Sequence, residues 1–229
     1  MAIADNLAAV RARIAAACLA AGRDPAGVRL LPMSKTHPPE ALLEARAAGV
    51  RRFGENRPQE LAEKARALAG TDIEWAFAGH LQTNKAKLIA TYAAEFQALD
   101  SLRLAADLDR RCQEVGRQLD VLVQVNTSGE PQKHGIEPGA ALEFAAGLAA
   151  FDALRVRGLM TMAINSPDPA RVAACFDRLA EVQTRLREAS GGGWEELSMG
   201  MSGDFELAIA RGATCVRVGT AVFGTRSAA

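Results

Sequence analysis

The feature that most constrains the fold is a repeated alternation between short apolar runs and longer segments with helical spacing. Eight runs have the composition of strands: 28–33, 50–53, 75–78, 95–99, 120–125, 155–160, 196–199 and 214–218. Between them lie seven segments predicted as helices: 39–48, 58–68, 84–92, 102–118, 139–149, 169–189 and 205–211. An amphipathic helix is also predicted before the first strand, because Ile3, Leu7, Val10, Ile14 and Cys18 recur at three- and four-residue steps.

Strands that alternate with helices indicate a parallel sheet covered by helices on its faces. Successive apolar residues within a strand, as in Val121-Leu122-Val123, favour burial on both faces. Eight such units in 229 residues predict one domain over residues 1–229, an α/β fold of the (β/α)8 TIM barrel type with an additional N-terminal helix. An open doubly wound sheet is the alternative, because hydrophobic periodicity does not report whether a sheet closes.

The charge balance excludes several classes of function. The chain carries 27 basic and 27 acidic residues, for a formal net charge of zero, and has no run of like charges. General nucleic-acid binding and attachment to anionic membranes both need a basic surface, so neither partner is expected. The first helix contains Asp5, Arg11 and Arg13 inside its apolar pattern, which is typical of neither a signal peptide nor a membrane span.

The four cysteines indicate a reducing compartment. Cys18, Cys112, Cys175 and Cys215 lie far apart in the sequence and among apolar residues, with no Cys-x-x-Cys pair. Free thiols in such surroundings behave as small apolar side chains, so we expect buried thiols and no structural zinc site. A soluble, cytoplasmic protein is the expectation.

In a barrel, functional side chains gather at the carboxyl ends of the strands, and Lys35 follows the first predicted strand. A lysine there points into a concave, partly desolvated mouth. Such surroundings lower the pKa of an amine and leave part of it neutral, as Schiff-base formation requires. The alternative is a lysine that forms an ion pair or extends to solvent.

The loops after the seventh and eighth strands commonly form a phosphate site in this fold. Here they contain Ser202-Gly203-Asp204 and Gly219-Thr220. Ser202 is predicted to be the N-cap of the next helix, which would place its hydroxyl and backbone N–H groups near phosphate oxygens. Ordinary turns are the alternative. Together with Lys35, a phosphate cradle indicates pyridoxal 5'-phosphate (PLP), although a sugar phosphate in a Schiff-base aldolase fits the same residues.

Several short motifs then match a known family in order and spacing. They occupy residues 34–36, 53–56 with 59–60, 79–85, 157–160, 197–202, and 216–220 with 223–224. Together they closely resemble the pyridoxal phosphate homeostasis protein family, whose barrel is similar to the N-terminal domain of alanine racemase. The match spans essentially the whole chain.

The resemblance implies a role for each residue of the cofactor site. Lys35 would carry PLP as a Schiff base, and Ser202, Gly219 and Thr220 would bind its phosphate. Arg217 would face the pyridine nitrogen. A guanidinium in that place disfavours protonation of the ring nitrogen and makes the ring a weak electron sink.

Asn56, by the same resemblance, would lie beside the ring substituents. Three other residues keep alternatives open. His80 is either an acid or base or a histidine held in its loop by backbone hydrogen bonds, and Lys133 either binds a second cofactor molecule or is a solvated loop charge. His37 stands where the family usually has a lysine.

The resemblance implies a carrier or buffer of PLP in intracellular vitamin B6 homeostasis, with no catalytic residue and no metal. Its expected partners are PLP and PLP-dependent apoenzymes, and the chain is expected to be monomeric. The alternative is a PLP-dependent amino-acid racemase. In alanine racemase a tyrosine supplied with the help of a C-terminal β domain is the second base, whereas the only tyrosine here, Tyr92, lies in a predicted helix.

Overall fold

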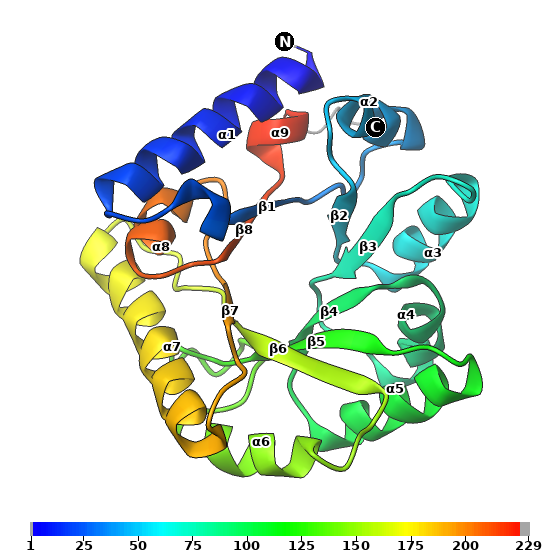
Figure 1. Cartoon of the computed structure of the whole chain (residues 1–229), viewed down its shortest axis with the longest axis vertical. Helices are drawn as coiled ribbons and strands as arrows, with labels where there is room; N and C mark the ends of the chain where they lie inside the picture. Colours follow the sequence, from blue (N-terminus) through cyan, green and yellow to red (C-terminus); the bar gives the residue numbers. More distant parts are fainter. Residues whose placement is uncertain (1, 225–229) are drawn as a thin grey trace.

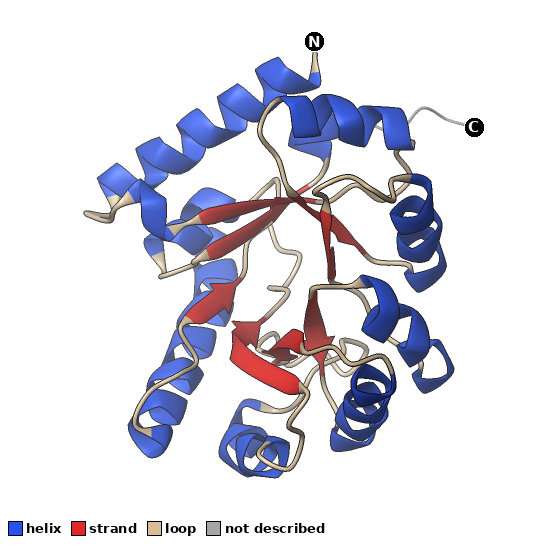
Figure 2. Ribbon diagram, turned by 45° about the vertical axis from the view of Figure 1, so that its right-hand side comes forward, coloured by secondary structure: helices blue, strands red, loops and turns tan. Residues whose placement is uncertain are grey.

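A computed structural model describes residues 2–224 and contains a barrel of eight parallel strands surrounded by helices (Figures 1 and 2). The strands are β1 (Arg29–Pro32), β2 (Arg52–Glu55), β3 (Glu74–Phe77), β4 (Glu95–Leu99), β5 (Leu119–Gln124), β6 (Leu154–Met160), β7 (Glu196–Ser198) and β8 (Cys215–Val218). Each strand from β2 to β7 pairs with the next, and β8 pairs with β1. A parallel bridge between Met33 and Gly54 joins β1 to β2. The predicted (β/α)8 barrel is therefore confirmed, and the open-sheet alternative is wrong.

The helices lie outside the barrel, as the alternation predicts. They are α1 (Ile3–Ala20), α2 (Pro39–Ala47), α3 (Pro58–Ala67), α4 (Ala86–Tyr92), α5 (Leu102–Glu114), α6 (Ala141–Leu148), α7 (Pro169–Ser190), α8 (Phe205–Ala210) and α9 (Thr220–Phe223). Single 3-10 turns, η1 (Pro25–Gly27), η2 (Thr83–Lys85) and η3 (Pro138–Ala140), precede β1, α4 and α6. No helix of the described residues is long and apolar enough to cross a membrane.

Some boundaries differ from those predicted, for identifiable reasons. β2 begins at Arg52 and extends to Glu55, because Gly54 and Glu55 pair in register with β3. α5 ends at Glu114, four residues before the predicted end. Gly116 there adopts a φ of 63°, a left-handed conformation that stops a helix. The short helix α9 was not predicted.

Helix α1 covers the side of the barrel where β8 meets β1. Its buried face consists of Leu7, Val10, Ile14 and Cys18, the stripe that the sequence predicts. The helix lies beside α8 and α9 (Figure 1), and the Asn6 side chain donates a 2.9 Å hydrogen bond to the carbonyl oxygen of Val222 in α9. The N-terminal helix is therefore attached to the element that follows the last strand.

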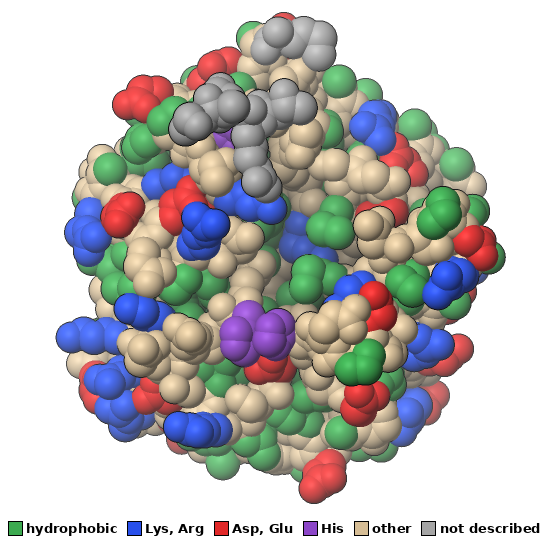
Figure 3. Space-filling view, turned by 180° about the vertical axis from the view of Figure 1, so that it is seen from behind, with side chains coloured by type: hydrophobic (Ala, Val, Ile, Leu, Met, Phe, Trp, Pro, Cys, Tyr) green, Lys and Arg blue, Asp and Glu red, His purple; other side chains and the backbone are tan. Residues whose placement is uncertain are grey.

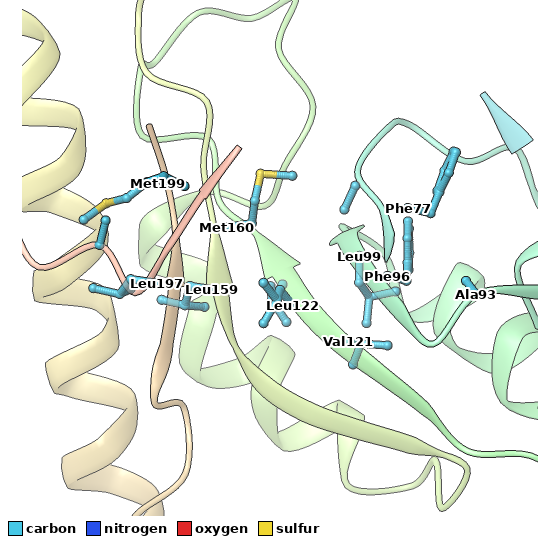
Figure 4. Close-up of a cluster of buried hydrophobic side chains, with 14 of the residues drawn as sticks. Phe77, Ala93, Phe96, Leu99, Val121, Leu122, Leu159, Met160, Leu197 and Met199 are labelled. Atoms are coloured by element: carbon cyan, nitrogen blue, oxygen red, sulfur yellow. The ribbon is translucent and has the colours of Figure 1, made fainter. Parts of the chain in front are cut away.

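The main apolar core lies between the strands and the helices. Figure 4 shows part of it, with Phe77, Phe96, Leu122 and Leu159 projecting from β3, β4, β5 and β6. The ring centroids of Phe77 and Phe96 are 5.9 Å apart. As expected, all four cysteines are buried free thiols, and both tryptophans are buried in this core.

The interior of the barrel contains polar side chains as well as apolar ones. Leu31, Ala76 and Cys215 form a small separate apolar cluster. Beside it, the Glu95 carboxylate accepts hydrogen bonds from Arg29 at 2.9 Å and from Arg52 at 2.7 Å. Side chains on a strand alternate between the two faces of the sheet. Residues two positions apart therefore both face the barrel interior, and the later one lies nearer the carboxyl end.

Candidate functional site

A cavity of about 280 Å³ opens at the carboxyl end of the barrel, among the segments that follow β1, β7 and β8. Figure 3 views the molecule from behind and shows a hollow near the middle of that face. The lining includes the predicted site residues Lys35, Ser202, Arg217, Gly219 and Thr220. Five of the six residues assigned to the cofactor site thus surround one cavity.

Lys35 lies three residues after the end of β1, and its side chain is partly buried. Among the described residues, no hydrogen bond or ion pair involves its amine. The residues on either side are fixed: the Ser34 carbonyl accepts a 2.7 Å hydrogen bond from Lys64 Nζ, and the Thr36 N–H donates to Glu60 Oε1 at 2.5 Å. The Lys35 amine is therefore the unpaired group of a rigid segment.

A buried charge network holds this segment in place. Lys64 Nζ lies 2.6 Å from Glu55 Oε1 and 2.8 Å from Glu60 Oε1, and the Ser34 hydroxyl donates to Glu55 Oε1 at 2.6 Å. Burial raises the pKa of the Glu55 carboxyl, while the hydrogen bonds from Lys64 and Ser34 oppose the rise. Thr36 has a φ of 67°, a strained conformation for a residue with a branched side chain. The network therefore offsets backbone strain next to Lys35.

Sequence reasoning missed Lys64, which lies in the middle of α3. The available signal was the i,i+4 spacing of Glu60 and Lys64, which places both side chains on one face of the helix. Glu55 and Glu60 belonged to the motif that carried the family resemblance, but the motif assigned them no partner.

Arg217 projects from β8 and is 5% exposed. One guanidinium nitrogen donates to Ser198 Oγ at 2.7 Å and the other to the Thr161 carbonyl at 2.8 Å. Ser198 Oγ in turn donates to Gln97 Oε1 at 2.7 Å inside the barrel. Burial lowers the pKa of the guanidinium, and in the described part of the chain no carboxylate lies within ion-pairing distance of it.

Arg217 is consequently a fixed hydrogen-bond donor in the cavity wall. Sequence reasoning identified this residue and quoted Ser198 within a family motif, but it gave Ser198 no role and did not find Gln97. Ser198 accepts from Arg217 and donates to Gln97. Residues two apart on a strand share a face. Gln97 lies two positions after Glu95 on β4, and this spacing is the signal that could have placed it in the barrel interior.

The backbone on the other side of the cavity is suited to an anion. Helix α9 begins at Thr220, and the first N–H groups of a helix have no partner inside it. A Cβ atom at Gly219 would lie 3.2 Å from the carbonyl oxygen of Met33, so glycine permits the close approach of β8 to β1 here. Gly203 has open space where a Cβ would stand.

The predicted N-cap role of Ser202 is wrong. Asp204 occupies the N-cap position of α8, and its Oδ1 accepts a 2.6 Å hydrogen bond from the Met201 N–H. The acidic side chain satisfies the turn locally, so Ser202 lies in the turn before the helix. It still lines the cavity.

Asn56 does not line this cavity. Its backbone packs against Gly79, where an added Cβ would lie 2.5 Å from the Asn56 carbonyl oxygen. Its side-chain Oδ1 is buried and accepts no hydrogen bond from the described residues. A buried acceptor without a donor is costly, so Asn56 has unused hydrogen-bonding capacity at the end of β2.

A larger hollow of about 680 Å³ lies along α2 and α3, where Pro38, Arg57 and Glu63 are among its lining residues. It contains Lys64, whose amine is fully engaged, and it lacks both Lys35 and the glycines after β7 and β8. We therefore place the candidate site in the smaller cavity.

The other polar residues singled out from the sequence have identifiable contacts. His37 lines the cavity and its ring stacks on Phe223, with ring centroids 4.9 Å apart. Lys133 Nζ is paired with Glu130 at 2.5 Å and donates to the Ala163 carbonyl at 2.9 Å. His80 is exposed, and its ring stacks on another histidine. Tyr92 ends α4, on the outside of the barrel.

These features together fit a small phosphorylated aldehyde. An unpaired amine, a buried guanidinium and helix-initial N–H groups line one cavity. The amine suits covalent attachment, the N–H groups suit a phosphate, and the guanidinium suits a ring acceptor atom.

Comparisons with known proteins give the same family. Residues 2–227 match the family model described as "Alanine racemase, N-terminal domain". The chain is 44% identical over 224 residues to a pyridoxal phosphate homeostasis protein of Pseudomonas aeruginosa, with 98% of this chain and 96% of the relative covered. A protein of the same name from Escherichia coli strain K12 is 44% identical over 234 residues, with 98% and 97% covered.

A solved structure agrees with this assignment. PipY of Synechococcus elongatus PCC7942, solved with PLP bound, superimposes with a TM-score of 0.86 at 36% identity, over 97% of this chain and all of that one. These full-length matches are far above the level at which only a fold is shared. The chain therefore belongs to the pyridoxal phosphate homeostasis protein family, built on the barrel of the alanine racemase N-terminal domain.

Proposed function

We propose that this protein binds PLP as a Schiff base on Lys35 and acts as a carrier or buffer of the cofactor in vitamin B6 homeostasis. The observation that carries the proposal is the unpaired Lys35 amine in a cavity that also contains the buried Arg217 guanidinium. In the bound form the amine condenses with the aldehyde of PLP and one water molecule is lost. The names of the relatives and the PLP bound to PipY support the assignment.

Other residues are assigned by the same proposal. The N–H groups at Gly219 and Thr220, with the Ser202 hydroxyl, hold the phosphate, and Arg217 faces the pyridine nitrogen. Asn56 is assigned to a place beside the ring substituents. The unused Oδ1 of Asn56 supports this last assignment.

A carrier is favoured over an amino-acid racemase. A guanidinium beside the ring nitrogen opposes protonation of that nitrogen and makes the ring a weak electron sink. A racemase on the same barrel still works with two bases, one on each face of the substrate carbon, so the second base decides between the two functions. The only tyrosine of the chain, Tyr92, ends α4 outside the barrel, with the Arg66 guanidinium 5.9 Å from its ring centroid.

The proposal includes a cellular setting. We place the protein in the cytoplasm as a monomer of one domain, where it transfers PLP to apoenzymes that depend on it. The four buried free thiols are consistent with a reducing compartment.

The test is reduction of the purified protein with borohydride after incubation with PLP. We expect visible absorption before reduction and, after proteolysis and mass spectrometry, a pyridoxyl group on the peptide that contains Lys35. The Lys35→Ala variant should lack both signals, while Lys87→Ala, an exposed lysine of α4, should keep them. A protein that takes up no PLP would overturn the proposal.

The carrier role is separable from binding. Loaded protein mixed with a PLP-dependent apoenzyme should restore its activity as PLP is transferred. Exchange of the α-hydrogen of alanine at about 1 per second or faster would indicate an enzyme instead.

A further inference from the structure

A cluster of potential metal ligands lies at the same end of the barrel, on different strands from the proposed cofactor site. His80 follows β3, Asp100 follows β4 directly, and His134 lies in the loop after β5. One ligand atom from each residue lies within 4.8 Å of the other two. None of these residues lines the cavity that contains Lys35.

The two imidazole rings are stacked almost in parallel, with centroids 3.8 Å apart and an interplanar angle of 9°. His80 Nδ1 lies 3.9 Å from Asp100 Oδ2. In Figure 3 histidine side chains lie together beside the hollow, with acidic atoms next to them. Two stacked histidines beside a carboxylate gather two possible nitrogen ligands and one possible oxygen ligand in one place.

The backbone beneath each ligand is held rigidly. The loop with His134 is fixed by Asn126, whose side chain donates to the Glu130 and Lys133 carbonyls, and by Gln124, which donates to the His134 carbonyl at 2.9 Å. Gly135 follows with a φ of 121°, a conformation that suits glycine alone.

The other two ligands are equally well supported. Ser101, directly after Asp100, is the N-cap of α5, and its hydroxyl accepts a hydrogen bond from the Leu104 N–H. Gly79, the residue before His80, packs directly on the Asn56 backbone. Hydrogen bonds and close packing thus support the backbone around all three residues, while their ligand atoms already lie within 4.8 Å of one another.

We infer that His80, Asp100 and His134 form a binding site for a divalent transition metal ion, with Zn²⁺ as the best match. Zinc takes imidazole nitrogen at about 2.0–2.1 Å and carboxylate oxygen at about 2.0–2.2 Å, so two of its ligands stand roughly 3.4 Å apart. The observed separations exceed this by little more than 1 Å. Two histidines and one carboxylate are a common ligand set for zinc.

Three protein ligands leave one tetrahedral position open to water or another small ligand. A metal lies in the plane of each imidazole that binds it, so binding must rotate the rings out of their parallel stack. Both histidines are exposed, and His80 has 46% of its side chain accessible, which permits that rotation.

The test is zinc titration by calorimetry of the purified full-length chain, after treatment with a chelator and desalting. We expect one Zn²⁺ per chain. His80→Ala and His134→Ala should each weaken binding at least tenfold, because changes to residues that merely support a metal ligand already cost about 10–100-fold. Asp100→Asn should also weaken it, since the anionic donor is lost.

The matched control is His37→Ala, which removes the one other histidine of the chain, a residue that lines the cavity with Lys35 and stacks on Phe223. It should bind zinc as the unmodified protein does. Histidine ring signals in nuclear magnetic resonance spectra should shift for two residues, not three. Absence of binding, or unchanged binding in both His80→Ala and His134→Ala, would overturn the inference.

Discussion

The position of Lys35 depends on charged residues that lie behind it. Lys64 and Glu55 are both almost fully buried. They form an ion pair, with Lys64 Nζ 2.6 Å from Glu55 Oε1. The pair has the Ser34 hydroxyl and the Glu60 carboxylate as further hydrogen-bond partners. Buried charges of this kind add little net stability while both are present, but loss of one leaves the other unpaired in an apolar region.

Lys64→Met should therefore lower the free energy of unfolding by about 3–5 kcal/mol near neutral pH. Urea denaturation measures this change. Lys87→Met is the matched control, because Lys87 is exposed on α4 and its replacement should change stability by less than about 0.5 kcal/mol. Equal stabilities of the two variants would show that the buried pair has no structural role.

The same variant should respond to pH. Burial raises the pKa of Glu55 in the folded state, and Lys64 opposes the rise, so its removal raises this pKa further. A raised folded-state pKa gives stability that is fully present below the unfolded value of about 4.3 and is lost as pH rises through the folded value. The loss of unfolding free energy in Lys64→Met, relative to the unmodified protein, should thus be smaller at pH 5 than at pH 8. A loss that does not depend on pH would contradict this account.

Lys35 was predictable as a candidate because functional side chains gather at the carboxyl ends of barrel strands, a rule independent of side-chain detail. Arg217 was assigned through the family resemblance, and the structure places both residues at the same cavity. The Ser202 cap was not predictable, because Asp204 competes for the same turn through its own carboxylate. The Asp204 side chain makes no capping hydrogen bond to α8, so which residue occupies the N-cap position depends on a backbone geometry that the sequence alone does not specify.

Among the elements, the ends of β2 and β3 show how loops support a site. Gly79 follows β3 and packs on the backbone of Asn56, which follows β2. Strand alternation predicted both strands, but the end of β2 was placed two residues too early. The reason is that Gly54 and Glu55 look like loop residues in isolation, and only pairing with Ala76 and Phe77 makes them part of the sheet.

Gly79→Ala should separate these two loops. The new Cβ would lie 2.5 Å from the Asn56 carbonyl oxygen, and backbone atoms cannot move aside without disturbing the strand ends. We expect a loss of about 1–3 kcal/mol in unfolding free energy, as for other overpacked sites, together with weaker retention of PLP. Both are measured on the same preparation, by urea denaturation and by absorption after dialysis.

Gly139→Ala provides the comparison, since a Cβ there meets no atom within 4 Å. That variant should match the unmodified protein or exceed it slightly, because alanine restricts the unfolded chain. If Gly79→Ala behaves in the same way, the close packing of the two loops is not required for the site.

For the whole molecule, the repeated alternation of strands and helices predicted eight parallel strands with helices outside them, but it did not decide between a closed barrel and an open sheet. The pairing of β8 with β1 and the Met33–Gly54 bridge settle that choice. The alternation was also not sufficient to predict how the barrel is completed. The last helix, α9, has four residues and covers little of the surface near β8. α1, from the opposite end of the chain, lies beside α8 and α9 and supplies the missing apolar cover.

Leu7→Ala tests whether α1 is an integral part of the barrel. Leu7 is fully buried, so truncation should lower the free energy of unfolding by about 2–5 kcal/mol. Leu19→Ala is an internal control, because Leu19 lies on the same helix with 70% of its surface exposed, and the change in helix propensity is the same. A single cooperative transition in urea, shifted for Leu7→Ala and unshifted for Leu19→Ala, is the expected result. If both variants unfold alike, α1 contributes no packing energy. In that case the N-terminal helix would be an appendage, and α8 and α9 alone would have to shield the junction between β8 and β1.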